Sequence, residues 1–142
     1  MDKEQIKKLL REILQEECEK DAVRYVPLGA IHVSESDRFQ TGNSSDQVYT
    51  HDLFSLAESP RLGCGVMEME QTTFPWTLQY DEIDYVLEGS LTIVHGNRSV
   101  TAQEGELIYI PKGSSIRFSV NDHARFLYFT YPADWQNQTG DR

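Results

Sequence analysis

The sequence predicts an all-β barrel or sandwich preceded by a single helix. Short runs with strand composition recur along most of the chain, separated by turn-forming residues at intervals of roughly eight to twelve positions. Helical periodicity is confined to residues 3–18. The clearest strand pattern runs from Tyr80 to Gly89, where apolar and acidic side chains alternate and a turn follows.

Residues 3–18 have the spacing of an amphipathic helix. Apolar side chains recur at three- and four-residue steps, with Lys and Glu on the other face; they are Ile6, Leu9, Leu10, Ile13, Leu14 and Cys18. One interpretation is a helix packed on its own barrel or on a dimer partner. Another is a docking helix that enters a groove on a different protein. A membrane-surface helix is disfavoured by the mixed charge.

The other strands are predicted from short apolar or alternating runs between turns. They are Val23–Val26, Ala30–Val33, Val48–Leu56, Leu62–Met69, Leu91–Val94, Ser99–Ala102, Leu107–Ile110, Ser115–Val120 and Arg125–Tyr131. The polar residues 34–47 predict a long loop, which in a compact domain is a lid, a binding loop or disordered. We expect three parts: an N-terminal helix (1–20), a β domain (21–135) and a polar, frayed tail (136–142), with Trp135 docked.

Composition excludes several classes of protein. A chain of 142 residues fits one domain with a substantial core, and its net charge of −10 argues against nucleic acid or an anionic membrane as a partner. No apolar run is long enough to span a membrane, and the first residues are too charged for a signal peptide. The cysteines, Cys18 and Cys64, predict no disulfide framework, so a reducing cytoplasm is expected.

Two stretches have the spacing of a known sequence pattern. Gly105 is followed after five residues by Pro111-x-Gly113, as in the motif G-x5-P-x-G-x2-H-x3-N. Glu82 and Gly89 fit the motif H-x-H-x3-E-x6-G. The chain therefore resembles the cupins, and this resemblance implies a jelly-roll β-barrel.

The histidines of these motifs are missing. Their positions are occupied by Trp76, Leu78 and Ile116. Because one carboxylate alone cannot hold a transition metal in a defined geometry, we expect no metal site and no tightly bound cofactor. The four histidines present lie away from the motif positions, and we interpret each as solvated or locally hydrogen-bonded rather than as part of a rebuilt metal site; they are His32, His51, His95 and His123.

A closer resemblance covers residues 62–135. The stretches FPWTLQYDEIDYVLEG, IPKGSSIRF and RFLYFTYPADW are similar to the C-terminal cupin domain of the EutQ family of ethanolamine-utilisation proteins. The resemblance implies a place in ethanolamine catabolism in cytoplasmic bacterial microcompartments. It also implies an acetate kinase activity that converts ATP and acetate to ADP and acetyl phosphate, and Mg²⁺ and ATP would then be required.

Glu82 and Asp84 are the leading candidates for a site. Strand parity places both on one face, which the cupin frame turns into the barrel. Two carboxylates in a concave, partly apolar site repel each other and lose solvation, so at least one should have a raised pKa unless a cation or donor compensates. With Tyr80 they are the predicted catalytic residues. In a kinase they would hold Mg²⁺ through water molecules.

Three further residues are candidates for cofactor binding: Trp76, Tyr109 and Lys112. Lys112 lies in Pro111–Ser115, which we interpret first as a turn and second as a phosphate contact. The alternative is a vestigial pocket whose carboxylates are hydrogen-bonded by aromatic side chains. No Walker A motif or hydrolase signature occurs.

Two functions remain open from the sequence. One is the acetate kinase that the resemblance implies, with a small molecule as ligand. The other is a non-enzymatic assembly module that binds microcompartment shell or core proteins through residues 1–18. A homodimer is expected in either case, because the apolar face of the helix needs a surface to cover.

Overall fold

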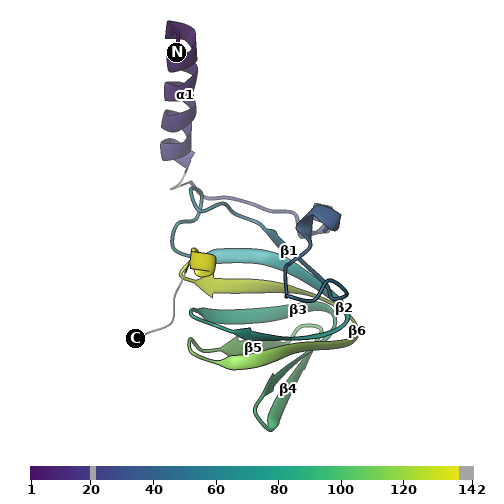
Figure 1. The fold of residues 1–142 in the computed structure, drawn as a ribbon. Helices are drawn as coiled ribbons and strands as arrows, with labels where there is room; N and C mark the ends of the chain where they lie inside the picture. The colour runs from purple at the N-terminus through teal and green to yellow at the C-terminus, as the bar shows by residue number, and fades with distance from the viewer. Residues whose placement is uncertain (20–21, 138–142) are drawn as a thin grey trace.

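Six strands and one long helix make up most of the described chain (Figure 1). The computed structural model describes residues 1–19 and 22–137. For residues 15–19 it describes the backbone alone. The helices are α1 (Lys3–Glu19) and the short 3-10 helices η1 (Leu28–Ala30), η2 (Glu35–Asp37) and η3 (Trp135–Asn137). The strands are β1 (Gln47–Asp52), β2 (Gly63–Thr77), β3 (Asp81–His95), β4 (Arg98–Gln103), β5 (Leu107–Ile110) and β6 (Ser115–Tyr131).

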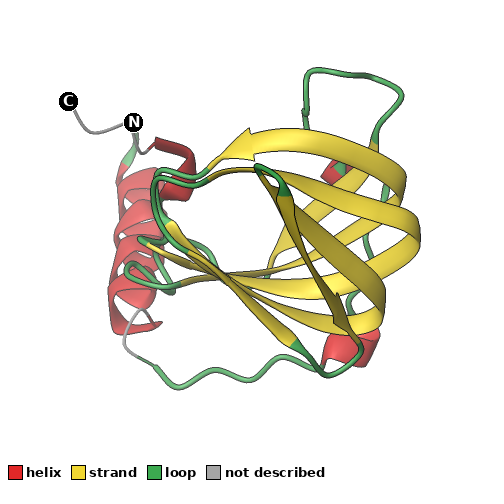
Figure 2. Ribbon diagram, turned by 90° about the horizontal axis from the view of Figure 1, so that it is seen from below, coloured by secondary structure: helices red, strands yellow, loops and turns green. Residues whose placement is uncertain are grey.

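All strand pairings are antiparallel, and β6 lies at the centre of the sheet. The order is β1-β2-β6-β3-β4, and β5 pairs with the first part of β3. The long strands curve, and Figure 2 shows them wrapping around a core as a barrel that does not close fully. The predicted all-β fold with one N-terminal helix is confirmed.

The core is filled from the inner faces of the curved strands. Phe74 of β2 stacks on Phe118 of β6 with ring centroids 5.2 Å apart, and Phe118 stacks in turn on Phe126 at 6.5 Å. Leu78 and Ile116, which occupy two of the histidine positions of the motifs, are buried in the same cluster. The inner faces of β2 and β6 are therefore held together by hydrocarbon contacts.

Strand β2 is longer than predicted. It continues past the predicted end at Met69 through a bulge at Gln71, whose φ is 43°. Thr72 holds the bulge, since its hydroxyl donates to the carbonyl of Glu70 at 2.7 Å and accepts the backbone N–H of Gln47 at 3.0 Å. A bulge lets a strand bend without ending its ladder, which is why the polar residues here do not form a turn.

Strands β6, β3 and β1 also differ in extent from the predictions. Strand β6 joins the predicted Ser115–Val120 and Arg125–Tyr131 into one strand, and β3 runs through Gly89 to include Leu91–Val94. The predicted Val48–Leu56 ends at Asp52 as β1. Strands β3 and β4 form an antiparallel hairpin across Gly96 and Asn97.

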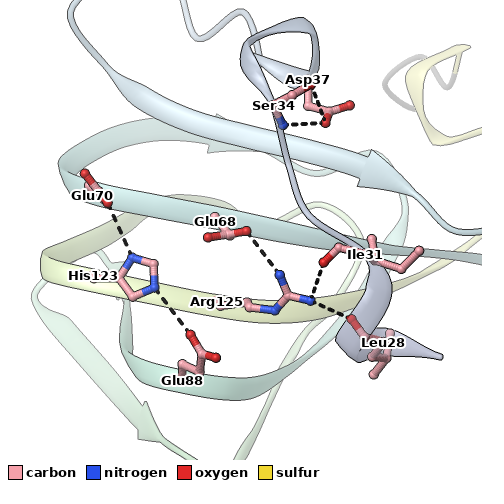
Figure 3. Close-up of polar contacts among 9 residues, drawn as sticks. All are labelled: Leu28, Ile31, Ser34, Asp37, Glu68, Glu70, Glu88, His123 and Arg125. Carbon is pink, nitrogen blue, oxygen red and sulfur yellow. Dashed lines mark hydrogen bonds and ion pairs between the residues drawn. The ribbon is translucent and has the colours of Figure 1, made fainter.

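The segment that leads into the barrel contains no strand. The predicted strands Val23–Val26 and Ala30–Val33 were wrong, and η1 lies between them. Arg125 of β6 holds this segment on the outside of the barrel, since its guanidinium donates to the carbonyls of Leu28 at 3.1 Å and Ile31 at 3.0 Å (Figure 3). The same guanidinium lies 3.2 Å from the carboxylate of Glu68 on β2.

Helix α1 stands apart from the barrel in Figure 1. The five apolar side chains of its stripe that the structure describes are between 44% and 63% exposed; they are Ile6, Leu9, Leu10, Ile13 and Leu14. The predicted boundary at residue 20 and the tail from residue 138 lie outside the described residues, as does the side chain of Cys18. Cys64 is a free thiol, and Trp135 packs against the core.

Gly89 allows β3 to continue beside β6. Its φ is 75°, and a side-chain carbon there would overlap the carbonyl oxygen of His123. We expect Gly89→Ala to destabilise the fold by about 3 kcal/mol or more, because backbone strain and overlap add. Urea unfolding monitored by circular dichroism measures the change.

The matched control is Gly96→Ala in the β3–β4 turn. Gly96 has a φ of 62° but nothing within reach of an added carbon. That change should cost only about 1 kcal/mol. If both changes lowered the free energy of unfolding equally, the contact with His123 would not be the reason that residue 89 is glycine.

Candidate functional site

The inner face of β3 carries two buried carboxyl groups. Glu82 is 5% exposed and Asp84 is fully buried, while Ile83 between them is 41% exposed on the outer face. The parity expected from the sequence is thus observed. Across the sheet, Glu82 is paired with Thr130 and Asp84 with Tyr128, both on β6.

An inner cavity of about 30 Å³ lies beside this face. Its apolar wall includes Met67, Phe74 and Phe118, and its polar wall includes Glu82 and Thr130. The volume suffices for about one water molecule. The Oγ1 atom of Thr130 is buried and has no hydrogen-bond partner among the described residues, so a polar ligand in the cavity would satisfy it.

Tyr80 connects the carboxyl pair to the rim of the barrel. The indole Nε1–H of Trp76 donates to the Tyr80 hydroxyl oxygen at 2.8 Å. The hydroxyl hydrogen of Tyr80 is then free to donate, and the carboxyl group of Glu82 is its hydrogen-bond partner. Burial, reinforced by the charge of Glu82, raises the pKa of Tyr80, so the phenol stays protonated and serves as a donor.

Burial sets the protonation of the carboxyl pair. It raises the pKa of Glu82 to about 7, an increase that hydrogen bonding only partly opposes. Burial and the charge of Glu82 raise the pKa of Asp84 well above its ordinary value. Both oxygens of Asp84 lack a hydrogen-bond partner among the described residues. The pair therefore holds at least one proton at neutral pH and can present a neutral carboxyl group as a hydrogen-bond donor.

An aromatic cover lies between this cavity and the wider opening of the barrel. We give this name to Phe39, Trp76 and Trp135, which are partly buried and pack on the core. The ring centroids of Phe39 and Trp76 are 5.2 Å apart, and those of Trp76 and Trp135 are 6.1 Å apart. Phe39 comes from the predicted loop 34–47, so that segment contributes directly to the site.

Above the cover the barrel opens into a mouth of about 770 Å³. Its rim includes Asp37, Arg38, His51 and Gln79. The Nδ1 atom of His51 lies 3.0 Å from one carboxylate oxygen of Asp37. The other oxygen accepts the backbone N–H of Ser34 at 2.9 Å (Figure 3). The hydrogen bond with His51 is the main cause that lowers the pKa of Asp37, so this carboxyl group remains ionised.

Arg38, which also borders the mouth, is held by its neighbours. Its guanidinium donates to Glu35 at 2.7 Å, to the carbonyl of Asp46 at 2.7 Å and to the Tyr49 hydroxyl at 3.0 Å. These bonds fix η2 against the outer face of β1, and Phe39 follows directly after them.

The structure brings together four of the six predicted site residues. Trp76, Tyr80 and Glu82 line the inner cavity, and Asp84 lies next to Glu82. The other two, Tyr109 and Lys112, lie elsewhere, on the outer side of β5 and in the turn after it. There the Tyr109 hydroxyl and the backbone N–H of Lys112 both donate to Asp81, at 3.3 and 2.8 Å.

Sequence reasoning missed the rim of the mouth. Asp37 and His51 are 14 positions apart and come from a 3-10 turn and a strand, so no motif links them. Phe39 and Trp135 likewise meet only in the folded chain. Among the described residues, no group of three or more His, Cys, Asp and Glu side chains is arranged to hold a metal ion.

Comparison with known proteins identifies the family. The family model described as ethanolamine utilisation protein EutQ matches residues 1–137. The chain belongs to the EutQ family. The match includes the N-terminal helix, which the resemblance over residues 62–135 did not reach.

Curated EutQ relatives carry a description of activity. The protein of Clostridioides difficile (strain 630), described as "Acetate kinase EutQ", is 56% identical over 97% of this chain and 96% of its own length. The Escherichia coli (strain K12) protein of the same description is 44% identical over 61% of this chain. The matched region is 37% of that longer protein.

Solved structures agree with the fold. The C. difficile EutQ structure has a TM-score of 0.81 and 62% identity, covering 84% of this chain and 89% of that one. A crystal structure of a Salmonella typhimurium LT2 protein described as a putative EutQ has a TM-score of 0.72 and 36% identity, covering 79% of this chain and 88% of that one. A cupin superfamily protein of Desulfitobacterium hafniense, 14% identical with a TM-score of 0.57, covers 80% of this chain and 95% of that one and shows the cupin fold. Within the described chain, no helix is long and apolar enough to cross a membrane.

The buried carboxyl pair should make this EutQ protein less stable as pH rises. The folded pKa of Glu82 is raised above its ordinary value of 4.5 to about 7, so the folded state holds a proton that the unfolded state releases in this interval. The stability gained from that proton is complete below about pH 4.5 and is lost as pH rises to about 7. We expect Glu82→Gln to reduce the decline in unfolding free energy between pH 5 and pH 7 by about 1–3 kcal/mol.

Urea unfolding at several pH values measures this decline. The matched control is Glu104→Gln in the exposed β4–β5 turn, which should keep the full decline. An unchanged pH dependence in Glu82→Gln would contradict the assignment of a shared, buried proton.

Proposed function

We propose that this EutQ-family protein transfers a phosphoryl group between ATP and acetate during ethanolamine catabolism in a bacterial microcompartment. The observation that carries the proposal is the small cavity with one apolar and one acidic wall beneath a wide mouth. The C. difficile relative described as an acetate kinase supports it, because it matches nearly the whole chain.

The inner cavity has the chemistry that acetate requires. Its phenylalanine and methionine wall suits the methyl group, and the hydroxyls of Tyr80 and Thr130 suit the carboxylate. A protonated carboxyl of the Glu82–Asp84 pair adds a donor that a carboxylate accepts readily. Since about 30 Å³ holds only about one water molecule, the aromatic cover moves when acetate enters.

The mouth suits the nucleotide. Trp76 and Trp135 offer aromatic surfaces for the base, and Gln79 offers an amide for polar contacts. Phosphoryl transfer depends on positioning and on neutralisation of phosphate charge. Mg²⁺ enters this reaction with the nucleotide. Glu82 borders the cavity that faces the phosphates, whereas Asp84 has no exposed surface and serves to hold the shared proton.

Replacement of Glu82 tests the proposal directly. We expect Glu82→Gln to lower acetate-dependent ADP formation by about 100-fold or more, because it removes the carboxyl group that borders the cavity and keeps the size. A coupled ADP assay, with acetyl phosphate trapped as its hydroxamate, measures both products. Glu104→Gln is the control and should keep wild-type turnover.

Two outcomes would count against the proposal. Wild-type turnover in Glu82→Gln would place the reaction elsewhere in the molecule. A wild-type protein inactive with millimolar acetate and Mg²⁺-ATP would favour the second candidate function.

That second candidate is a non-enzymatic assembly module, and the exposed stripe on α1 favours it. Leu10 and Ile13 are each 53% exposed, and the helix stands off the barrel (Figure 1). An uncovered amphipathic helix is suited to a groove on a shell or core protein, or to a second copy of this chain in a homodimer. Assembly through α1 is compatible with catalysis in the barrel.

Substitutions on the stripe test assembly. The double change Leu10→Gln and Ile13→Gln should abolish co-sedimentation with shell proteins and leave the unfolding temperature of the barrel unchanged. The control Lys8→Gln and Glu12→Gln alters the polar face with no change in net charge and should keep co-sedimentation. If removal of residues 1–18 unfolds the barrel, α1 belongs to the core and the docking role is wrong. Sedimentation velocity of the same variants reports on the homodimer.

A further inference from the structure

The Asp37–His51 pair borders the mouth and has no role in the function proposed for Glu82 and Asp84. Its carboxylate is fixed at both oxygens, by the backbone N–H of Ser34 and by Nδ1 of His51. Asp37 stays ionised, and an ionised carboxylate only accepts hydrogen bonds. Nδ1 of His51 therefore carries the hydrogen, and Nε2 is the ring nitrogen left for a ligand.

The position of His51 makes that nitrogen accessible. The side chain is 41% exposed and borders the mouth together with Trp76 and Gln79. The other histidine of a comparable arrangement, His123, lies between Glu70 and Glu88 on the outer face of the sheet (Figure 3). His51 alone of these two is placed where a ligand in the mouth can reach it.

The charges around the mouth give His51 a specific task. The side chains that border the mouth include two carboxylates, Asp37 and Asp52, and two groups that can be positive, Arg38 and His51. Arg38 already donates to Glu35, to the carbonyl of Asp46 and to Tyr49. Nε2 of His51 makes no hydrogen bond within the described chain, so it is the nitrogen that a phosphate in the mouth would meet.

We infer that Nε2 of His51, oriented by Asp37, contacts the phosphate chain of the nucleotide in the mouth of the barrel. This inference rests on the proposed function and adds to it a nucleotide-binding residue and its positioning partner. The base stacks on the aromatic cover, and the phosphates extend across the rim to His51. When its ring is protonated, His51 donates a charge-assisted hydrogen bond to a phosphate oxygen. When its ring is neutral, Nε2 accepts a hydrogen bond from a phosphate hydroxyl.

Steady-state kinetics separate this contact from acetate binding. We expect His51→Ala to raise the KM for ATP by about 10- to 100-fold, the loss of one hydrogen bond to a charged group, with the KM for acetate within about twofold of wild type. Asp37→Asn should raise the KM for ATP by a smaller factor, since the ring remains but loses its orientation. His95→Ala at the exposed end of β3 is the matched control and should change neither constant.

A binding measurement makes the result independent of turnover. Titration of the wild-type protein with Mg²⁺-ATP should shift the His51 imidazole signals in a carbon-13 NMR spectrum, whereas adenosine, which lacks phosphate, should leave them in place. Equal shifts with adenosine and ATP, or none with ATP, would overturn the inference. This titration also decides the case in which His51→Ala fails to fold.

The outcomes distinguish the inference from the function on which it rests. Acetate kinase activity that is insensitive to His51→Ala overturns the inference and leaves the function standing. A phosphate-dependent shift of His51 in a protein without acetate kinase activity supports the nucleotide contact and rejects the acetate reaction.

Discussion

The burial of two carboxyl groups with no cationic side chain beside them in the described chain is the constraint around which the site is built. Removing an ionised carboxylate from water costs far more than any single hydrogen bond returns, so Glu82 and Asp84 are stable inside the barrel only with a shared proton. Leu78 and Ile116, at positions where the cupin motif has histidine, make the surroundings more apolar and strengthen this effect. Glu82, at the glutamate position of the cupin motif, is thus a carboxyl group whose pKa burial raises to about 7.

The aromatic cover links the two halves of the site. Trp76 borders both the inner cavity and the mouth, and it also donates to Tyr80. Phe39 follows Arg38, whose bonds to Glu35 and Tyr49 fix it to the outer face of β1. A ligand that displaces the cover therefore disturbs the hydroxyl next to the carboxyl pair and a segment anchored outside the barrel.

The sequence predicted which side chains of one strand share a face. It did not predict contacts between segments that are distant in the chain. Parity correctly placed Glu82 and Asp84 inside, because an alternating strand leaves only two choices and the motif selects one. The predicted strand ended at Met69, whereas β2 continues through a bulge at Gln71. A bulge and a turn contain the same polar residue types, so the sequence does not distinguish them. The segment 22–33 owes its conformation to the guanidinium of Arg125, some 95 positions away, and Asp37 meets His51 by the same kind of long-range packing.

Helix α1 contributes no residue to the described hydrophobic core of the barrel. The described core is complete without it, since every member of the hydrophobic cluster comes from residue 39 or later. The described side chains of its apolar stripe are 44–63% exposed, which is unfavourable in water, and a surface that covers them would recover that cost. The proposed chemistry of Glu82 and the proposed association through α1 therefore depend on separate sets of residues, so a substitution that tests one should leave the other intact.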